Sequence, residues 1–515
     1  MNENFIATEY ASLFATGERS ASDIAGQHIA IIRERNLDLN AVIAERFDTA
    51  VAEAADADKR RAAGAPVHGL DGVPITIKDS LDLAGFASTF GLPSRSAIKA
   101  TDDEVHVARL RAAGAIVLGK TNVAQLLLAH ETDNPLFGLT RHPLNSTRTP
   151  VGSSGGEAAI IAAGGSALGL GSDIAGSVRI PAAFCGLAAI KPTTGRLPDR
   201  GRFSAHPSQQ AVPSQVGVLA RSVTDVALGL DVANGGANPD RLPPASLFDW
   251  KQVDMSKLRV GWFDDDTILP PAPGVRRVVR EAAETLQRLG ATVTKWAPPD
   301  PRRAASIFVS LLAADGAASF ARARGTNALT PGLRAFYTLM RLPRSVLSAM
   351  AATGPLMGRD TLAEMTLPNI GHRDTLRYWD MVEARDHYAE IVQATLNSSD
   401  IGRIDVILSP PYPLPEPPHG TSGSFGFGGI YAILWNLLGY PAGVVPFGSV
   451  GEGEESDRAG RGDRMLKAAK AAEAGSIGLP LSVQVAARPW REDHALAVMN
   501  AIEMQTRKTS KGAML

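Results

Sequence analysis

Segments with helical periodicity alternate with short β-rich runs along most of this 515-residue chain, and this alternation constrains the fold more than any other feature. Helices and strands that alternate in sequence pack as separate layers, which is the arrangement of an α/β domain. Residues 101–104 (Thr-Asp-Asp-Glu) match a capping box, which predicts a helix running to Ala113 and closed by Gly114. The runs that predict buried strands are residues 73–77, 115–118, 404–408 and 481–485.

The composition limits what such a domain can bind. Hydrophobic residues make up 44% of the chain and charged residues 20%, so the chain can bury a large core. Its 52 Lys and Arg residues balance 53 Asp and Glu residues, which argues against a nucleic-acid partner. The single cysteine, Cys185, cannot form an internal disulfide and lacks the Cys/His spacing of a zinc site, so we expect it to pack as a small hydrophobic residue. These features predict a small, roughly neutral ligand, with no metal and no cofactor.

Residues 1–27 carry four acidic side chains and no long apolar run. A signal peptide needs a basic start and an apolar stretch, and a membrane anchor needs about 20 apolar residues. We therefore expect a cytoplasmic protein.

Between Pro150 and Pro192 the chain is dominated by Gly, Ala and Ser. Small residues allow backbones to approach each other and a ligand closely, which an active-site floor built from backbone amides requires. This stretch is the predicted chemical centre.

Two short patterns suggest other functions. Gly114 and residues 119–121 (Gly-Lys-Thr) match a P-loop, but the four residues between them form an apolar strand preceded by a helix, whereas a phosphate cradle is a loop between strand and helix. Residues 152–156 match Gly-x-Ser-x-Gly, which would make Ser154 the nucleophile of an α/β-hydrolase elbow. That fold also needs an oxyanion loop of the His-Gly-Gly type, which is not visible upstream.

A third interpretation joins distant motifs. They are residues 72–79 (Gly-Val-Pro-Ile-Thr-Ile-Lys-Asp), 119–122 (Gly-Lys-Thr-Asn), 134–138 (Asn-Pro-Leu-Phe-Gly), 152–156 (Gly-Ser-Ser-Gly-Gly), 171–186 and 191–195 (Lys-Pro-Thr-Thr-Gly). In these motifs and their order the sequence resembles the amidase signature family from about Leu70 onward. Within the family, residues 155–192, 440–446 and 478–480 are closest to the fatty acid amide hydrolases. The resemblance implies a large twisted mixed β-sheet covered by helices on both faces.

The resemblance also implies an acyl-enzyme mechanism with a Ser-Ser-Lys triad. Ser177 is then the nucleophile, Ser153 relays a proton, and Lys78 is the base that returns the proton to the departing amine. Lys78 must be uncharged, although an unperturbed lysine has a pKa of about 10.4, and burial at the end of an apolar strand would lower its pKa. Asp79 would oppose this change, but neighbouring strand residues point to opposite faces.

Other residues around the predicted triad take supporting roles by the same resemblance. The backbone N–H groups of the oxyanion hole would come from Ile174, Ala175, Gly176 and Ser177. Ser154 and Asp173 would support the centre by hydrogen bonds, and Arg179 would hold the loop after the nucleophile or simply pair with Asp173.

The family's relay serine follows a cis peptide bond, so we expect one at Gly152–Ser153. The family usually has Gly at positions 151 and 175, where this chain has Val151 and Ala175, and a positive φ at Ala175 would be costly.

Position relative to the family also suggests a hydrophobic channel leading to Ser177, which favours aryl or aliphatic amides as substrates. The expected lining residues are Leu127, Leu128, Ala129, His130, Phe425, Phe427 and Ile430. For the domains we expect an N-terminal helical segment at 1–66 and an amidase signature domain at 67–505. A cap at 332–360, a surface excursion at 448–474 and a C-terminal tail at 506–515 complete the division.

Three functions remain open from the sequence. The leading one is a free-standing amidase, which the same chemistry would extend to esters and carbamates. The second is a glutaminase subunit of a tRNA-dependent amidotransferase, which shares the motifs, and the third is a P-loop nucleotide-binding protein. The resemblance allows a homodimer, whereas peripheral contact of residues 337–357 with a membrane is not favoured.

Overall fold

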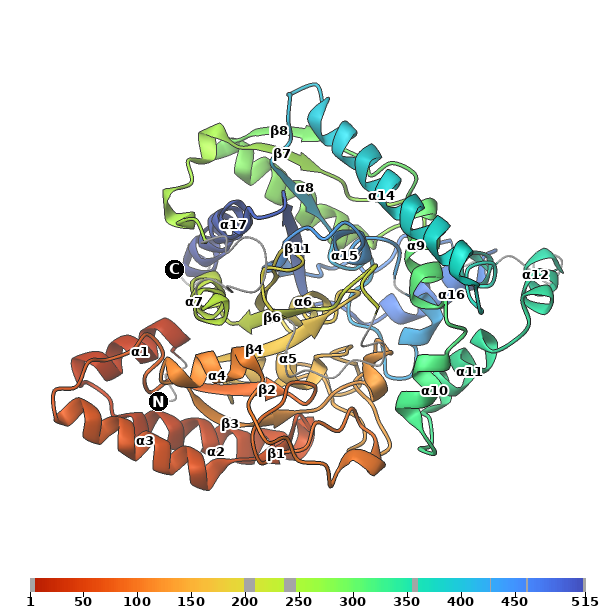
Figure 1. Ribbon diagram of the computed structural model, residues 1–515. Helices are drawn as coiled ribbons and strands as arrows, with labels where there is room; N and C mark the ends of the chain where they lie inside the picture. The colour runs from red at the N-terminus through yellow and green to blue at the C-terminus, as the bar shows by residue number, and fades with distance from the viewer. Residues whose placement is uncertain are drawn as a thin grey trace.

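The computed structural model describes residues 5–198, 209–235, 247–353, 360–426, 428–459 and 462–512. Their backbone forms an 11-stranded sheet with the strand order β1-β3-β2-β4-β6-β5-β10-β11-β9-β7-β8 (Figure 1). The strands are β1 (Val42–Glu45), β2 (Pro74–Lys78), β3 (Ile116–Thr121), β4 (Leu168–Asp173), β5 (Ala188–Lys191), β6 (Gln215–Ala220), β7 (Arg259–Trp262), β8 (Thr292–Lys295), β9 (Val406–Ser409), β10 (Ala442–Ser449) and β11 (Pro480–Ala487).

The sheet is mixed, as predicted. β2 runs parallel to both β3 and β4, and β7 runs parallel to both β8 and β9. The pairs that connect these two parallel groups, from β4 to β9, are antiparallel.

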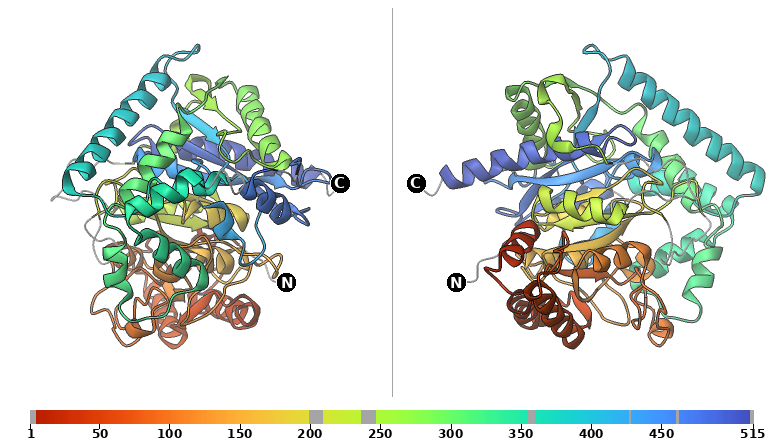
Figure 2. Two further views of the ribbon diagram at one scale, coloured as in Figure 1. Left: turned by 90° about the vertical axis from the view of Figure 1, so that its right-hand side faces the viewer. Right: turned by 60° about the vertical axis from the view of Figure 1, so that its left-hand side comes forward.

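Both faces of the sheet are buried, because successive side chains of a strand point to opposite faces. In β9, Val406 and Leu408 belong to one hydrophobic cluster and Ile407 to another. In β11, Val485 and Ala486 divide in the same way. Helices cover each face (Figure 2). The first cluster holds residues of α7 (Val223–Asn234), α8 (Pro273–Arg288) and α17 (Glu492–Gly512), and the second holds residues of α9 (Pro301–Leu312), α14 (Thr375–Asn397) and α15 (Ile433–Leu437).

The N-terminal segment supplies more than helices. It contains α1 (Ala7–Thr16), α2 (Ala21–Leu39) and α3 (Phe47–Ala62), but β1 between them pairs antiparallel with β3 and forms one edge of the sheet. Four residues between two helices are too few to show strand periodicity, so the sequence did not predict β1.

The helix predicted after residues 101–104 has a different cap. α4 (Val105–Ala112) starts after Glu104, whose side chain accepts hydrogen bonds from the amides of His106 and Val107. The expected N-cap, Thr101, lies outside this turn, so the capping-box prediction was wrong although the helix was correct.

The expected cap region contains α11 (Pro331–Met340) and α12 (Arg344–Thr353), while residues 354–359 lie outside the described residues. Leu333, Tyr337 and Met340 pack in one hydrophobic cluster with Phe90 and Leu126. The remaining helices are α5 (Gly155–Ala162), α6 (Arg179–Phe184), α10 (Ala318–Arg324), α13 (Thr361–Thr366) and α16 (Arg464–Glu473).

Two predicted boundaries fall on helices. α16 lies inside the expected surface excursion at 448–474, and its Met465 and Ala469 are buried, whereas residues 460–461 are outside the described ranges. α17 continues through the start of the expected tail to Gly512. The domain boundaries therefore stay a prediction. Among the helices that the structure describes, none combines the length and the apolar composition needed to span a bilayer.

Candidate active site

Lys78 is the last residue of β2, and its side chain points to the face of the sheet opposite to that of Ile75 and Ile77. Ile75 and Ile77 pack into the hydrophobic core, so the alternation of the strand directs Lys78 the other way. A hydrogen bond of 2.7 Å joins its Nζ to Ser153 Oγ, and both side chains are buried. Two of the three predicted catalytic residues, 75 positions apart in sequence, are thus in direct contact.

The backbone on both sides of Ser153 is held by hydrogen bonds. The peptide bond Gly152–Ser153 is cis, as predicted. Thr132 Oγ1 donates to the carbonyl of Val151 at 2.7 Å and accepts from the amide of Gly155 at 3.1 Å, so it bridges both sides of Ser153. The amide of Ser154 donates to the carbonyl of Ser177 at 3.2 Å, which holds the Ser177 loop against this segment.

The loop from Asp173 to Ser177 presents several backbone amides at one place. Gly176 has φ of +99°, and a Cβ atom there would lie 2.5 Å from the Ile180 side chain, so this position needs glycine. The Gly176 amide donates to Asp173 Oδ1 at 2.8 Å. The amides of Ile174, Ala175 and Ser177 donate no hydrogen bond to any described residue. Three of the four expected oxyanion donors are therefore open in this structure, and Gly176 is occupied.

Val151 and Ala175, which stand where the family usually has glycine, differ in backbone conformation. The left-handed φ of the loop falls on Gly176 and not on Ala175, so the methyl group of Ala175 meets no backbone penalty. Val151 does adopt a left-handed φ of 55°, a conformation that is unfavourable for a β-branched residue.

Asp173 and Arg179 form a buried ion pair at 3.0 Å beneath this loop. Burial raises the pKa of Asp173, but the charges of Arg179 and Lys191 outweigh burial and hold the pKa well below its usual range. The Arg179 guanidinium also donates to Gln484 Oε1 at 2.7 Å and to Asn436 Oδ1 at 2.6 Å. The start of α6, two residues after Ser177, is thus tied to α15 and to β11.

Asp79 does not share the surroundings of Lys78. Its carboxylate accepts hydrogen bonds from the amides of Thr89 and Phe90. Burial raises the pKa of Asp79, and nearby Lys120 lowers it. The expectation that strand alternation separates Asp79 from the Lys78 amine agrees with these contacts.

The other motif interpretations find no support in this geometry. Gly119, Lys120 and Thr121 lie inside β3, and Lys120 Nζ donates to the carbonyl of Ala87, so no phosphate loop exists there. The hydroxyl of Ser154 has no hydrogen-bond partner among the described residues, and in particular no histidine. Among the described residues, its hydrogen bond to Ser177 comes from its amide. Cys185 is buried, which raises the pKa of its thiol.

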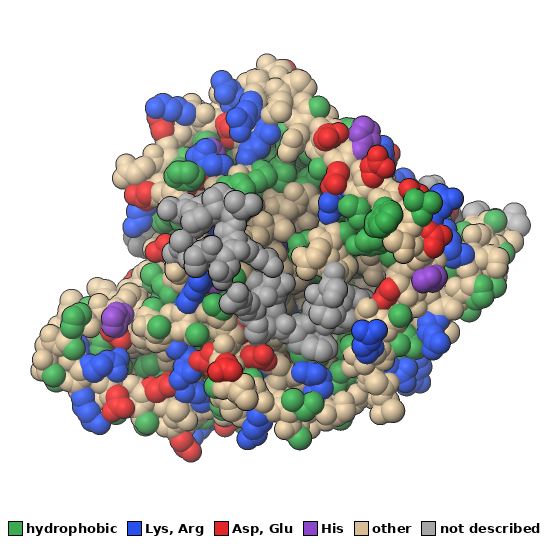
Figure 3. Space-filling view, viewed as in Figure 1, with side chains coloured by type: hydrophobic (Ala, Val, Ile, Leu, Met, Phe, Trp, Pro, Cys, Tyr) green, Lys and Arg blue, Asp and Glu red, His purple; other side chains and the backbone are tan. Residues whose placement is uncertain are grey.

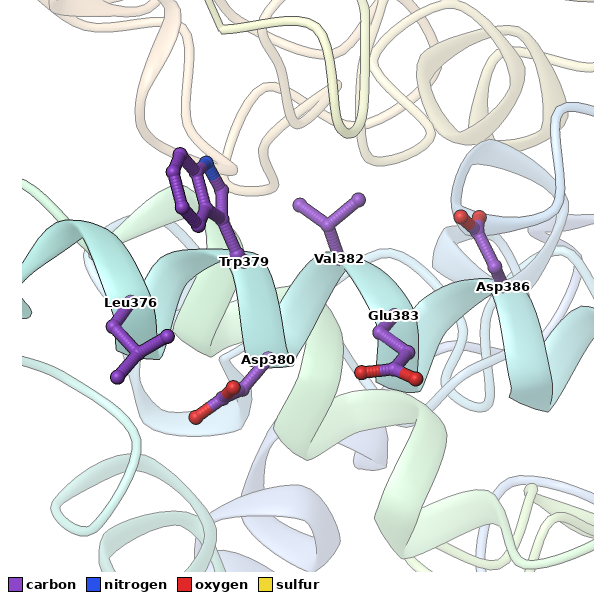
Figure 4. Close-up of a pocket in the computed structure, with 6 residues that line it drawn as sticks. All are labelled: Leu376, Trp379, Asp380, Val382, Glu383 and Asp386. Carbon is purple, nitrogen blue, oxygen red and sulfur yellow. The ribbon is translucent and has the colours of Figure 1, made fainter.

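A pocket of about 520 Å³ lies on another part of the surface, along α14 (Figure 4). It is lined by Leu376, Trp379, Asp380, Val382, Glu383 and Asp386, none of which is a predicted site residue. Trp379 and Leu376 are 63% and 66% exposed, and apolar side chains gather over this helix in Figure 3.

Comparison with known proteins identifies the family. The family model named Amidase matches residues 27–496. Fatty acid amide hydrolase 1 of Caenorhabditis elegans is 33% identical over 448 residues, which cover 84% of this chain and 76% of the relative. A putative amidase of Mycobacterium bovis is 33% identical over 466 residues, or 87% of each chain. The chain belongs to the amidase family. A solved fatty acid amide hydrolase shares the fold, with a TM-score of 0.81 at 24% identity over 97% of this chain and 84% of that one.

Membership makes this chain an amide hydrolase related to the fatty acid amide hydrolases, as its motifs implied. Two of the predicted substrate residues of this amidase-family chain, Ala129 and Phe425, lie beside the serine segment. The carbonyl of Ala129 would be 2.9 Å from a Cβ atom on Gly152. Leu127 and Leu128 pack against the cluster that contains α11, and Phe425 packs with Val151.

Three further predicted substrate residues differ in their surroundings. Burial lowers the pKa of His130 to about 4, and its ring packs edge-on against Tyr412. Ile430 is buried in the same cluster as Ala175 of the oxyanion loop. Phe427 lies outside the described residues.

Several residues that build the site of this amidase-family chain were not predicted from its sequence, because only pairing reveals them. Thr132, Asn436 and Gln484 hold the serine segment and Arg179, but each stands two to four residues outside a motif. Ser172 lies inside a motif, directly before Asp173, and contacts Lys78. Its position in the motif was a signal, but spacing alone does not show which strand it faces.

Proposed function

We propose that this chain hydrolyses hydrophobic carboxamides through an acyl-enzyme, with Ser177 as nucleophile, Ser153 as proton relay and Lys78 as base. The observation that supports this best is the buried 2.7 Å hydrogen bond between Lys78 Nζ and Ser153 Oγ. The backbone hydrogen bond from Ser154 to Ser177 supports it further, because it links the segment of Ser153 to the segment of Ser177.

The first half of the reaction forms the acyl-enzyme. Burial disfavours a charged ammonium, so Lys78 can act as an uncharged base. Ser177 Oγ attacks the carbonyl carbon, its proton passes to Ser153, and the proton of Ser153 passes to Lys78. The amides of Ile174, Ala175 and Ser177 can then donate to the carbonyl oxygen as it becomes negative.

The second half releases the two products. An amine is a poor leaving group until it is protonated, so Lys78 returns its proton through Ser153 to the nitrogen as the C–N bond breaks. Water then attacks the ester of Ser177 through the same relay, and the acid leaves. Esters and carbamates fit the same scheme, because each presents a carbonyl carbon to the nucleophile.

The substrate class follows from the apolar surroundings. Leu127, Leu128 and Ala129 are half-buried, and Phe425 and Ile430 are buried, on segments that contact Gly152, Val151 and the oxyanion loop. Apolar walls beside a serine nucleophile favour an aryl or aliphatic acyl group.

A covalent probe tests the nucleophile directly. After reaction with a fluorophosphonate, intact-mass spectrometry should show one adduct on the wild type and on Ser154→Ala, and none on Ser177→Ala. Labelling that survives Ser177→Ala would place the nucleophile elsewhere. A panel of aryl amides, long-chain amides and glutamine then identifies the substrate class, and turnover of glutamine alone would favour the amidotransferase alternative.

A further inference from the structure

The amine of Lys78 contacts a second serine besides Ser153. Nζ lies 3.0 Å from Ser172 Oγ and 3.2 Å from the carbonyl oxygen of Ser172, in addition to 2.7 Å from Ser153 Oγ. Ser172 is on β4, is buried, and has no role in the proposed mechanism. One residue thus provides two of these three oxygens.

The protons of these groups restrict how the amine can be oriented. An uncharged amine has two N–H groups and one lone pair. A carbonyl oxygen only accepts, so the Ser172 carbonyl takes one N–H. If the Ser172 hydroxyl takes the other, the lone pair faces Ser153 Oγ and can receive its proton. If an N–H faces Ser153 instead, the amine cannot act as the base.

We propose that Ser172 is a positioning residue whose hydroxyl orients the uncharged Lys78 amine so that its lone pair faces Ser153. This inference rests on the proposed function. When the proton moves from Ser153 to Lys78, the ammonium has three N–H groups, which match the three oxygens without movement of heavy atoms. Such preorganised contacts lower the barrier because no reorientation accompanies the proton transfer.

The inference predicts a selective loss with amides. An amide needs the returned proton on its leaving nitrogen, whereas an activated ester has a leaving group that departs without one. Ser172→Ala keeps the carbonyl but removes the hydroxyl, so the amine can rotate into the inactive orientation. We expect kcat/KM for an amide to fall by about 10- to 100-fold, the effect of one hydrogen bond to a reacting group, and to fall less for the matching activated ester.

The test measures the ratio of kcat/KM for an amide and for the ester of the same acid, in variants that show unchanged melting. Ser172→Thr retains the hydroxyl and should restore the ratio. Ser166→Ala is the matched control, because Ser166 is a buried serine just before the same strand whose hydroxyl donates to the carbonyl of Leu168. Lys78→Ala serves as the reference, because it gives the amide-to-ester ratio of kcat/KM in the absence of the group that protonates the leaving amine. Should Ser172→Ala fail to fold, Ser172→Cys provides a weaker acceptor of similar size.

The outcomes separate the two proposals. A lower ratio in Ser172→Ala or Ser172→Cys, a normal ratio in Ser172→Thr and Ser166→Ala, and intact labelling of Ser177 support the inference. Equal losses on amide and ester, or no loss, with Ser177 still labelled, overturn the inference but leave the proposed function standing. Absence of Ser177 labelling in the wild type overturns both.

Discussion

At the scale of single residues, the buried carboxyl of Glu157 makes the free energy of unfolding depend on pH. It lies on the first turn of α5 and is fully buried, and its carboxyl accepts hydrogen bonds from Thr121 Oγ1 at 2.6 Å and from Thr76 Oγ1. Burial raises the pKa of Glu157 to about 7, although the hydrogen bonds from both hydroxyls lower it. The carboxyl therefore carries its proton in the folded protein over a pH range in which an exposed glutamate has lost it.

This difference gives a stability prediction for Glu157→Gln. Between the unfolded pKa of about 4.3 and the folded pKa of about 7, the folded state binds more protons, so the contribution is complete below about pH 4.3 and is lost as pH rises through about 7. The loss is on the order of 3 kcal/mol of the free energy of unfolding. The free energy of unfolding should be measured with denaturant from pH 5 to 8.5 for both proteins. The value of the wild type minus that of the variant should decrease as pH rises, because the glutamine of the variant cannot ionise and the other groups are common to both. A difference that is independent of pH contradicts the assignment.

At the scale of elements, the small residues of the predicted chemical centre allow a close helix–strand contact. A Cβ atom on Gly156 would lie 2.6 Å and 2.7 Å from the backbone N and O of Asn122, and 2.8 Å from the carbonyl oxygen of Ala41. The first turn of α5 therefore lies against the backbone that follows β3. Because α5 begins two residues after Ser153, this contact sets where the serine segment starts.

We predict that Gly156→Ala lowers both stability and activity. The obstructing atoms are backbone and cannot rotate away, so the helix must shift, at a cost of about 1–3 kcal/mol. The free energy of unfolding, measured in urea, and kcat/KM for an amide should both decrease, although the variant retains Ser177.

Gly26→Ala is the matched control for this element. Gly26 is an exposed residue inside α2, and a Cβ atom there meets nothing within 4 Å. Alanine should therefore raise the free energy of unfolding by about 0.4–1 kcal/mol and leave the kinetics unchanged. If the two variants behaved alike, the close contact of α5 would not explain why Gly156 has to be glycine in this fold.

At the scale of the whole molecule, the first helix, α1, is held by a residue more than 200 positions away. Asp225 on α7 accepts hydrogen bonds from the amides of Ala7 and Thr8 at 2.8 and 2.9 Å and from Thr8 Oγ1 at 2.9 Å. The N-cap of α1, Ile6, has no side-chain oxygen that could serve the same amides. The first helix is thus capped by the middle of the chain.

Asp225→Ala should release α1 from the domain. The amides of its first turn lose their acceptor, at a cost of about 1–3 kcal/mol, and hydrogen exchange of residues 7–16 should accelerate. Asp58→Ala is the reciprocal control, because Asp58 accepts from the amides of Ala21 and Ser22 and therefore caps α2. It should accelerate exchange in α2 and not in α1. Faster exchange of α1 in both variants would indicate a general loss of stability instead.

The sequence by itself determined the features that depend on local pattern and residue type. Alternating periodicity indicated the layered α/β architecture, and the motif order pointed to Lys78, Ser153, Ser177 and the cis bond before Ser153. The small residues around Gly156 predicted a close backbone approach. These conclusions need only neighbours in sequence or a comparison of motifs.

Only the tertiary structure decided which groups meet across strands. Register between β2 and β4 brings Ser172 to Lys78, and the fold brings Asn436 and Gln484 to Arg179. The turn geometry after β4 directs the Gly176 amide to Asp173 and leaves its neighbours open. A hydrogen bond is fixed to within a few tenths of an ångström and in direction, and sequence spacing cannot set such geometry between residues that are 94 or more positions apart.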